Sequence, residues 1–401
     1  MLKTIKITNF HSIGNEQELS FEIAPKEILD NSACKINDKT SLNLVVCTVG
    51  HNASGKTNTL KALNYICWLV NDAYTNLKSS SGTIVDPHKL HSKENTKFEL
   101  EFFNDGILYQ YIIELNNQEI IHEYLGQNIV KGFSRIFECT RNGNNWDYKS
   151  PSIKINKEDQ KRFQILTNIP LLSLLISTGY LSQITFFNKI LSNVVREGKV
   201  SVNSFSSPFY IFNKLERDNN LCKNVLSYIK EFDFSISDFS FQEVELVNST
   251  NPDVKRKEVF LKCQHGGIDK GFSLNFFDES DGAKQSISIL TEILPILQSG
   301  GVAILDEIED GLHPEIIQKI IALFERKKTN PNKAQLLFST HQHILLNDRT
   351  KTQIFFAEKN NESLETEIYR LDDIEGVRND ENYFNKYTAG SYGATPQLGV
   401  L

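Results

Sequence analysis

Residues 50–57 read GHNASGKT and match the pattern GxxxxGKT at every specified position. The two glycines let the backbone curve closely around phosphate oxygens, so that successive N–H groups point at an anion. Lys56 supplies a cation for the β and γ phosphates, and Thr57 supplies a hydroxyl ligand for Mg²⁺. The stretch therefore predicts a phosphate-binding loop for a nucleoside triphosphate with Mg²⁺. The residues expected to bind this cofactor are Gly50, Asn52, Ser54, Gly55, Lys56, Thr57 and Asn58.

The segments on either side of the loop have the composition that such a loop requires. Residues 42–49 form an apolar, β-branched run, which is typical of a buried parallel strand. Apolar residues recur at helical spacing between residues 58 and 73. The order strand, glycine loop, helix favours a phosphate site over a chance glycine-rich turn.

An acidic motif, VAILDEIEDGLHP at residues 302–314, places two carboxylates directly after an apolar strand. Ligands of α/β folds lie at the carboxyl ends of strands. Asp306 is expected to hold Mg²⁺ through its water shell, and Glu307 to orient or deprotonate the attacking water. Without the phosphate loop, the motif would predict only an exposed acidic turn.

Two further motifs lie near the acidic strand. In LLFSTH, residues 336–341, His341 closes a strand and is placed to sense the γ-phosphate, with His343 as a competing candidate. ESDGAKQ, residues 279–285, opens a helix just before the acidic strand. Taken alone, it predicts a helix N-cap at Ser280.

The order of these motifs resembles the ABC-type ATPase heads of the SMC and RecF-like group. That resemblance implies an α/β fold, a P-loop NTPase of ABC or SMC-head type, with a mixed sheet, an antiparallel β meander and an inserted helical subdomain. It also implies that Ser280 and Gly282 bind the γ-phosphate held by a second subunit, so that two heads enclose two ATP molecules. Asp281 and Ala283 stand where the usual signature LSGGQ has other residues.

Within that group, the chain is similar to bacterial abortive-infection AAA-type ATPases, the ATPase subunits of antiphage defence systems. The likeness rests on KITNFHSIG near the start, LDEIEDGLHP in the acidic motif and YTAGSYGATP near the end. It covers roughly residues 1–125 and 255–395. His11 stands where relatives carry Arg, and no Gln is assigned to a Q-loop.

The composition is that of an ordinary globular protein: 401 residues, 40% hydrophobic, with a net charge of −7. This charge argues against a protein that coats nucleic acid, and the basic run 255–257 is more typical of a solvated loop. The six cysteines form no CxxC pair, so neither a zinc site nor a disulfide framework is indicated. The apolar stretch 165–181 is too short and too polar for a membrane span, and we expect a cytoplasmic protein.

Changes in pattern along the chain suggest three parts. Residues 1–150 are expected to form an N-terminal ATPase lobe with the P-loop and an antiparallel meander, turning at 104–106 and at Asn142-Gly143. Residues 151–254 are expected to be a helical insertion, with a Ser/Asn-rich joint at 201–208. Residues 255–401 are expected to form a C-terminal lobe with the signature turn, the acidic strand and the switch histidine.

Three functions remain open on these grounds. The leading hypothesis is an ATP-hydrolysing sensor of an antiphage system, which assembles into a homodimer or larger oligomer. It would respond to a phage-derived trigger and control a separate effector, a nuclease or toxin. The second hypothesis is a RecF-like DNA-repair ATPase, and the third is a scaffold in which ATP is structural and turnover is negligible.

Overall fold

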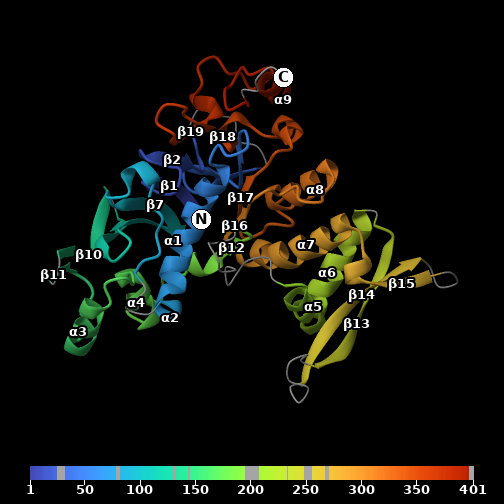
Figure 1. The fold of residues 1–401 in the computed structure, drawn as a ribbon, viewed down its shortest axis with the longest axis horizontal. Coiled ribbons are helices and arrows are strands. Elements are labelled where there is room, and N and C mark those ends of the chain that lie inside the picture. The colour runs from blue at the N-terminus through green and yellow to red at the C-terminus, as the bar shows by residue number, and fades with distance from the viewer. Residues whose placement is uncertain are drawn as a thin grey trace.

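The computed structural model describes residues 1–24, 32–77, 82–129, 132–142, 145–194, 207–232, 234–247, 255–266 and 271–396. Helix α1, Lys56–Asn71, lies between a mostly parallel sheet and an antiparallel sheet (Figure 1). Its apolar side chains are buried around most of its circumference. The helix that follows the P-loop is therefore a core element shared by both sheets, and the predicted α/β fold is confirmed.

The parallel sheet has the strand order β12-β16-β17-β6-β18-β19, and only β19 runs antiparallel to its neighbour. Strands β6, β16 and β17 are buried on both faces, which explains their continuous apolar sequences. Since these three are parallel neighbours, their carboxyl ends meet at one edge. The strands are β6 (Val45–Val49), β12 (Ile190–Ser192), β16 (Val302–Leu305), β17 (Gln335–Ser339), β18 (Ile354–Lys359) and β19 (Thr366–Arg370).

The parallel sheet separates two hydrophobic cores. Along β6, Val46 belongs to one core while Val45 and Cys47 belong to the other, because successive strand side chains point to opposite faces. The first core contains α1 and the antiparallel sheet. The second contains α7 (Asp281–Ser299) and α8 (Pro314–Glu325). The sheet edge that bears the motifs is thus supported on both sides.

The antiparallel sheet has the order β11-β10-β9-β8-β7-β1-β2, so the predicted meander is confirmed. Asp105 and Gly106 have φ of 49° and 81° and form the tight turn from β7 to β8. At the second predicted turn, Asn142 pairs with Asn145, and Gly143 lies outside the described residues. The strands are β1 (Leu2–Thr8), β2 (Gln17–Ser20), β7 (Thr96–Asn104), β8 (Ile107–Leu115), β9 (Ile120–Asn128), β10 (Phe133–Asn142) and β11 (Asn145–Lys149).

The segment 151–254 differs from the predicted helical insertion, because it holds strands as well as helices. Its three-residue strand β12 joins the parallel sheet beside β16, and β13 (Ile236–Val247) forms a hairpin with β14 (Lys255–Gly266) across the predicted boundary. A three-residue strand shows no readable alternation. The joint at 201–206 lies outside the described residues, and the three-part division stays a prediction. The helices are α3 (Lys157–Ile165), α4 (Leu171–Ser177), α5 (Pro208–Arg217) and α6 (Asn219–Glu231).

The β13–β14 hairpin, with β15 (Gly271–Asn275) at its side, extends away from α5, α6 and α7 (Figure 1). A small sheet has the order β3-β5-β4. Within the described ranges, no helix combines the length and the apolar composition needed to cross a membrane. The remaining elements are β3 (Glu22–Ile23), β4 (Ala33–Lys35), β5 (Ser41–Asn43), α2 (Ala73–Asn76), α9 (Tyr383–Thr388) and the 3₁₀ turns Lys89–His91, Phe186–Lys189, Phe276–Asp278, His343–Asp348, Lys351–Gln353 and Leu371–Asp373.

Candidate functional site

Two glycines shape the loop between β6 and α1. Gly55 has a left-handed backbone (φ 106°), and a Cβ there would lie 2.1 Å from Oγ1 of Thr366. A Cβ on Gly50 would lie 2.2 Å from the carbonyl oxygen of Ala357. Both distances are far shorter than contact distance, so a larger residue would displace β18 or β19. The glycines that the pattern requires therefore also pack the loop against these strands.

Lys56 is buried at the start of α1 and folds back over the loop. Its Nζ donates to the carbonyl oxygens of Gly50 and His51, both at 2.9 Å. Burial lowers the pKa of Lys56, and the carboxylates of Asp306 and two neighbouring acids partly offset this effect. The acidic motif thus lies within electrostatic reach of the loop cation, as the sequence predicts.

The start of α1 has backbone donors for which the described part of the chain offers no acceptor. The helix has no side-chain N-cap, and no described residue accepts a hydrogen bond from the N–H groups of Gly55, Lys56 or Thr57. The Oγ of Ser54, beside them, is buried and has no hydrogen-bond partner in the described ranges. N–H groups at a helix start are suited to a phosphate oxygen. The loop therefore has the donors that a phosphate needs.

Side chains from distant segments hold the loop from behind. Thr366 Oγ1 donates to the carbonyl oxygen of Ser54 at 2.9 Å, and Ser12 Oγ lies 2.7 Å from Thr366 Oγ1. Asn58 Nδ2 donates to Ser12 Oγ at 2.7 Å, so a nucleotide contact by Asn58 stays a prediction. The N–H of His51 donates to the carbonyl oxygen of Ala394 at 3.1 Å. Sequence reasoning missed these contacts: Thr366 belongs to no motif, and the motifs that contain Ser12 and Ala394 indicated a family likeness without assigning either residue a role.

Asp306 follows β16 and is held from two sides. The Ser339 hydroxyl, at the end of β17, donates to its Oδ1. Asn193, just after β12, accepts from the Asp306 N–H at 2.7 Å and donates to its carbonyl oxygen at 2.9 Å. The carboxylate is thereby fixed while its second oxygen has no partner among the described residues. Asn193 carries no sequence signal, because its strand is too short to be recognised.

Glu307 has a left-handed backbone, with φ of 49°, which is uncommon outside glycine. Its N–H donates to Ser339 Oγ at 2.8 Å, and its side chain is 62% exposed. Its Oε1 lies 3.9 Å from Nε2 of His341. A strained backbone of this kind costs about 1–3 kcal/mol and persists where the surrounding contacts enforce it. Here it directs the carboxylate away from the core.

The two candidate histidines have different surroundings. The backbone N–H of His341 donates to the carboxylate of Glu309, and its ring faces Glu307. His343 lies edge-on to Tyr387, at 4.6 Å between ring centroids. Burial lowers the pKa of His343, and the charges of His341 and Lys56 add to this effect. His341 is therefore the candidate that faces the acidic motif, while Glu309, within the same acidic run, was missed as its support.

The predicted signature turn is a self-contained helix start. Ser280 Oγ accepts from the N–H of Ala283 at 3.3 Å and caps α7. A Cβ on Gly282 would lie 3.1 Å from the carbonyl oxygen of Gly311. Among the hydrogen bonds of the described residues, none links this turn to loop 50–57 of the same chain. The N-cap interpretation is thus supported, and a contact with a second subunit's nucleotide stays a prediction.

Three neighbouring strands deliver the charged groups to one edge. Strand β6 ends at the loop, β17 beside it ends before Thr340-His341, and β16 ends before Asp306-Glu307. The edge combines a cation, N–H donors that no described residue accepts, hydroxyl and carboxylate oxygens of the kind Mg²⁺ prefers, and an exposed carboxylate. An enzyme that transfers a phosphoryl group to water requires these groups.

A family model described as "AAA domain, putative AbiEii toxin, Type IV TA system" matches residues 45–347. Among solved structures, an SMC head bound to the C-terminal winged-helix domain of ScpA is 12% identical with a TM-score of 0.46, over 92% of this chain and 97% of that one. The SMC head domain from Thermotoga maritima is 12% identical with a TM-score of 0.42, over 92% of this chain and 98% of that one. No curated protein matches the chain significantly.

Proposed function

The chain belongs to the AAA-domain family described as "putative AbiEii toxin, Type IV TA system", and from this membership we propose that it is a Mg²⁺-dependent ATPase. One observation carries the proposal: the Lys56 ammonium lies within electrostatic reach of Asp306 and Glu307 at one sheet edge. A site with the cation alone would bind phosphate, but it would lack both a metal ligand and a base for the attacking water.

The chemistry of the donor set fits ATP with Mg²⁺. Lys56 would exchange its two carbonyl acceptors for β- and γ-phosphate oxygens, and the unpaired N–H groups of residues 55–57 would donate to the same phosphates. Thr57 and Asp306 would hold Mg²⁺ through hydroxyl and carboxylate oxygens. When bound, Mg²⁺ supplies positive charge that stabilises the transferring phosphoryl group.

Glu307 and His341 are assigned to the chemical step. The exposed Glu307 carboxylate accepts the proton of the attacking water, and its strained backbone keeps it directed at the site. His341, 3.9 Å from that carboxylate, would donate to the γ-phosphate of a bound nucleotide and so register its presence. The N-terminal end of α7, with Ser280 and Gly282, would face a second copy and complete its site in a homodimer or larger oligomer.

We further propose that the nucleotide state controls a separate toxic effector in a bacterial antiphage defence system. A difference between two protein states acts only through a partner that binds one state more tightly. The toxin–antitoxin wording of the family description is the support for this setting. A phage-derived molecule would then be the trigger that shifts the nucleotide state.

The decisive experiment compares Glu307→Gln with the wild type. ATP affinity should be retained, because Lys56 and Asp306 are intact, while hydrolysis should slow by about two orders of magnitude. Sedimentation with ATP and Mg²⁺ should show greater self-association of the variant. Glu216→Gln, an exposed acid on α5, is the control and should behave as wild type. Unchanged turnover in Glu307→Gln would refute the assignment.

A growth experiment tests the biological part. The chain expressed alone should neither harm a host nor cut nucleic acid, and expression with its genetic neighbour should restrict phage only when Lys56 and Glu307 are intact. Degradation of DNA or RNA by the purified chain would contradict the proposal. Hydrolysis stimulated by DNA with a steep salt dependence would indicate the repair function instead. Tight ATP retention without phosphate release would indicate a scaffold.

A further inference from the structure

Three side chains with metal-binding atoms meet behind the P-loop. His88 and His91 lie at the two ends of a short 3₁₀ turn, and Glu365 directly precedes β19. One ligand atom from each residue lies within 4.8 Å of the other two. A tetrahedral Zn²⁺ ion with ligand bonds near 2 Å holds its ligand atoms about 3.3 Å apart, so small side-chain rotations suffice.

The ring of His91 is held between two carboxylates. Its Nδ1 lies 3.0 Å from Oε1 of Glu94, and its Nε2 lies 2.9 Å from Oε1 of Glu365. A neutral imidazole carries one N–H, so a ring that donates to Glu94 presents only a lone pair to Glu365. That lone pair and the carboxylate repel each other unless a positive charge lies between them. Either a second proton on the ring or a metal ion can supply this positive charge.

The Glu94 contact is also the contact that a metal-binding histidine needs. Metal-ligating histidines commonly donate their other ring N–H to a carboxylate, which fixes the tautomer and aims the free nitrogen at the ion. Glu365 is held in the same way, because its Oε2 accepts from the backbone and side-chain nitrogens of Asn15, at 3.2 and 2.8 Å. One oxygen of Glu365 is therefore anchored while the other faces His91.

The loop that carries both histidines is preorganised around a single buried side chain. Asn9 Nδ2 donates to the carbonyl oxygens of His91 and Glu94, at 3.0 and 2.9 Å, and its Oδ1 accepts from the His88 N–H at 2.9 Å. The ring nitrogens of His88 make only long contacts, 3.3 Å to Leu90 N and 3.4 Å to Leu364 O. The backbone is thus fixed, and the buried His88 ring would exchange one of these two long contacts for an ion.

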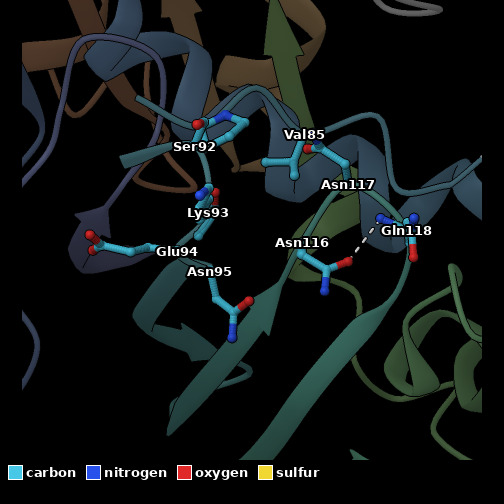
Figure 2. A pocket seen from close by; sticks show the side chains of 10 residues that line it. Val85, Ser92, Lys93, Glu94, Asn95, Asn116, Asn117 and Gln118 are labelled. Carbon is cyan, nitrogen blue, oxygen red and sulfur yellow. Dashed lines mark hydrogen bonds between the residues drawn. The ribbon is translucent and has the colours of Figure 1, made fainter. Parts of the chain in front are cut away.

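The outer side of this loop is open to solvent. Ser92, Lys93, Glu94 and Asn95 line a hollow of about 200 Å³ together with the β8–β9 connection 116–118. Figure 2 shows the Glu94 side chain directed away from Gln118. The His91 side chain is itself 30% exposed, so water and a small ion can reach the cluster.

We propose that His88, His91 and Glu365 form a binding site for a divalent transition-metal ion, with Zn²⁺ as the ion that the donors fit best. Two imidazoles and one carboxylate are a ligand set that Zn²⁺ accepts, with a fourth position for water. Mg²⁺ prefers oxygen ligands alone and belongs at the nucleotide edge. The site is separate from Thr57 and Asp306.

The position of the site indicates its effect. Glu365 is adjacent to Thr366, whose hydroxyl supports the P-loop at Ser54. An ion at this point would join the loop 88–91 to the strand that braces the phosphate loop. It would stabilise the native state, because an ion that binds only the folded chain adds its binding free energy to folding.

The experiment uses the full chain without an affinity tag, freed of metal and nucleotide. Titration with Zn²⁺ should show one equivalent bound, and Co²⁺ should give the visible absorption of a four-coordinate nitrogen and oxygen site. His88→Ala and Glu365→Gln should each weaken Zn²⁺ affinity by about a hundredfold. His122→Ala, which removes a histidine paired with one carboxylate, and Asp306→Asn should leave it unchanged.

Three outcomes would overturn the proposal. In the first the wild type binds no Zn²⁺, in the second both ligand variants bind Zn²⁺ as tightly as the wild type, and in the third Asp306→Asn abolishes Zn²⁺ binding. The first would leave His91 as a protonated histidine between two acids. If a ligand variant fails to fold, zinc X-ray absorption of the wild type still decides. Two imidazole ligands and one carboxylate support the site, and any other ligand set refutes it.

Discussion

Helices α1 and α4 both begin with backbone N–H groups directed at a place for an anion, but the two places are filled differently. At α4, the N–H groups of Leu171 and Leu172 donate to the two oxygens of Glu123, at 2.6 and 2.8 Å. At α1, the N–H groups of residues 55–57 have no acceptor among the described residues. One helix start is closed by the chain's own carboxylate, and the other is open to a ligand.

The difference shows what it costs the chain to bury a carboxyl group of its own. Burial raises the pKa of Glu123 to about 7, although Leu171, Leu172 and the Tyr111 hydroxyl all donate to it. The desolvation cost is therefore present in every state of the protein. At α1, the charge arrives with the ligand and leaves with it. A closed helix start can only stabilise the fold, whereas an open one can distinguish two states.

The largest effect expected at the open helix start follows Lys56→Ala. The substitution removes the cation that the loop offers to the β and γ phosphates, and ATP affinity should fall about a thousandfold, or roughly 4 kcal/mol. Titration calorimetry with ATP and Mg²⁺ measures the change. Lys61→Ala, on the next turn of α1, is the control and should bind normally. Retained affinity in a folded Lys56→Ala chain would mean that the loop is not the nucleotide site.

At the closed helix start, Glu123→Ala should lower the free energy of unfolding by about 3 kcal/mol, because two buried N–H groups and the Tyr111 hydroxyl lose their acceptor. Urea denaturation measures the loss, and ATP affinity should change little. If Glu123→Ala lost ATP binding while its stability stayed unchanged, Glu123 would have a ligand-binding role and not a structural one.

The pH dependence of stability sharpens the same point. The pKa of Glu123 is about 7 in the folded chain, against an ordinary value of 4.5, so the folded state binds this proton more tightly than the unfolded state. Stability from this group is fully present below pH 4.5 and is lost as the pH rises through 7. Between pH 5 and 6.5, the free energy of unfolding of the wild type should fall by about 2 kcal/mol relative to that of Glu123→Gln. Parallel curves for the two chains would disprove the raised pKa.

The start of α7 is capped by its own Ser280 and is also proposed to face a phosphate, so it combines features of α1 and α4. Substitutions there should have the smallest effects on hydrolysis and stability. Ser280→Asp preserves a good N-cap but adds a negative charge to a position proposed to face a second subunit's phosphate. Hydrolysis should fall about tenfold with stability unchanged. Ser280→Ala should instead cost about 1 kcal/mol of stability through the lost cap. Equal hydrolysis in Ser280→Asp and wild type would confine Ser280 to capping.

The sequence predicted best those features that are encoded locally. Asp306 directly follows an apolar strand, His341 comes two positions after one, and Lys56 ends the glycine loop that follows a third. Their spacing therefore indicated both the element and the end at which each lies. Asn193 and Thr366 act on the site across long stretches of chain, and their roles depend on strand neighbours that local patterns do not specify. The buried Glu123 lies in β9 and contacts the start of α4. It had no sequence signal either, because a single acid in a strand is ordinarily solvent-facing.

The place of β6 in the parallel sheet has a consequence for biosynthesis. Its neighbours are β17 and β18, and the Thr48 hydroxyl donates to the carbonyl oxygen of Phe338, 290 positions later. At about 5–20 residues per second, the ribosome needs roughly 15–60 seconds to deliver those strands. During that time an apolar, β-branched segment has no strand partners in its final sheet. The nascent chain therefore acquires its phosphate loop late, and chaperone supply during translation should influence the yield of active protein.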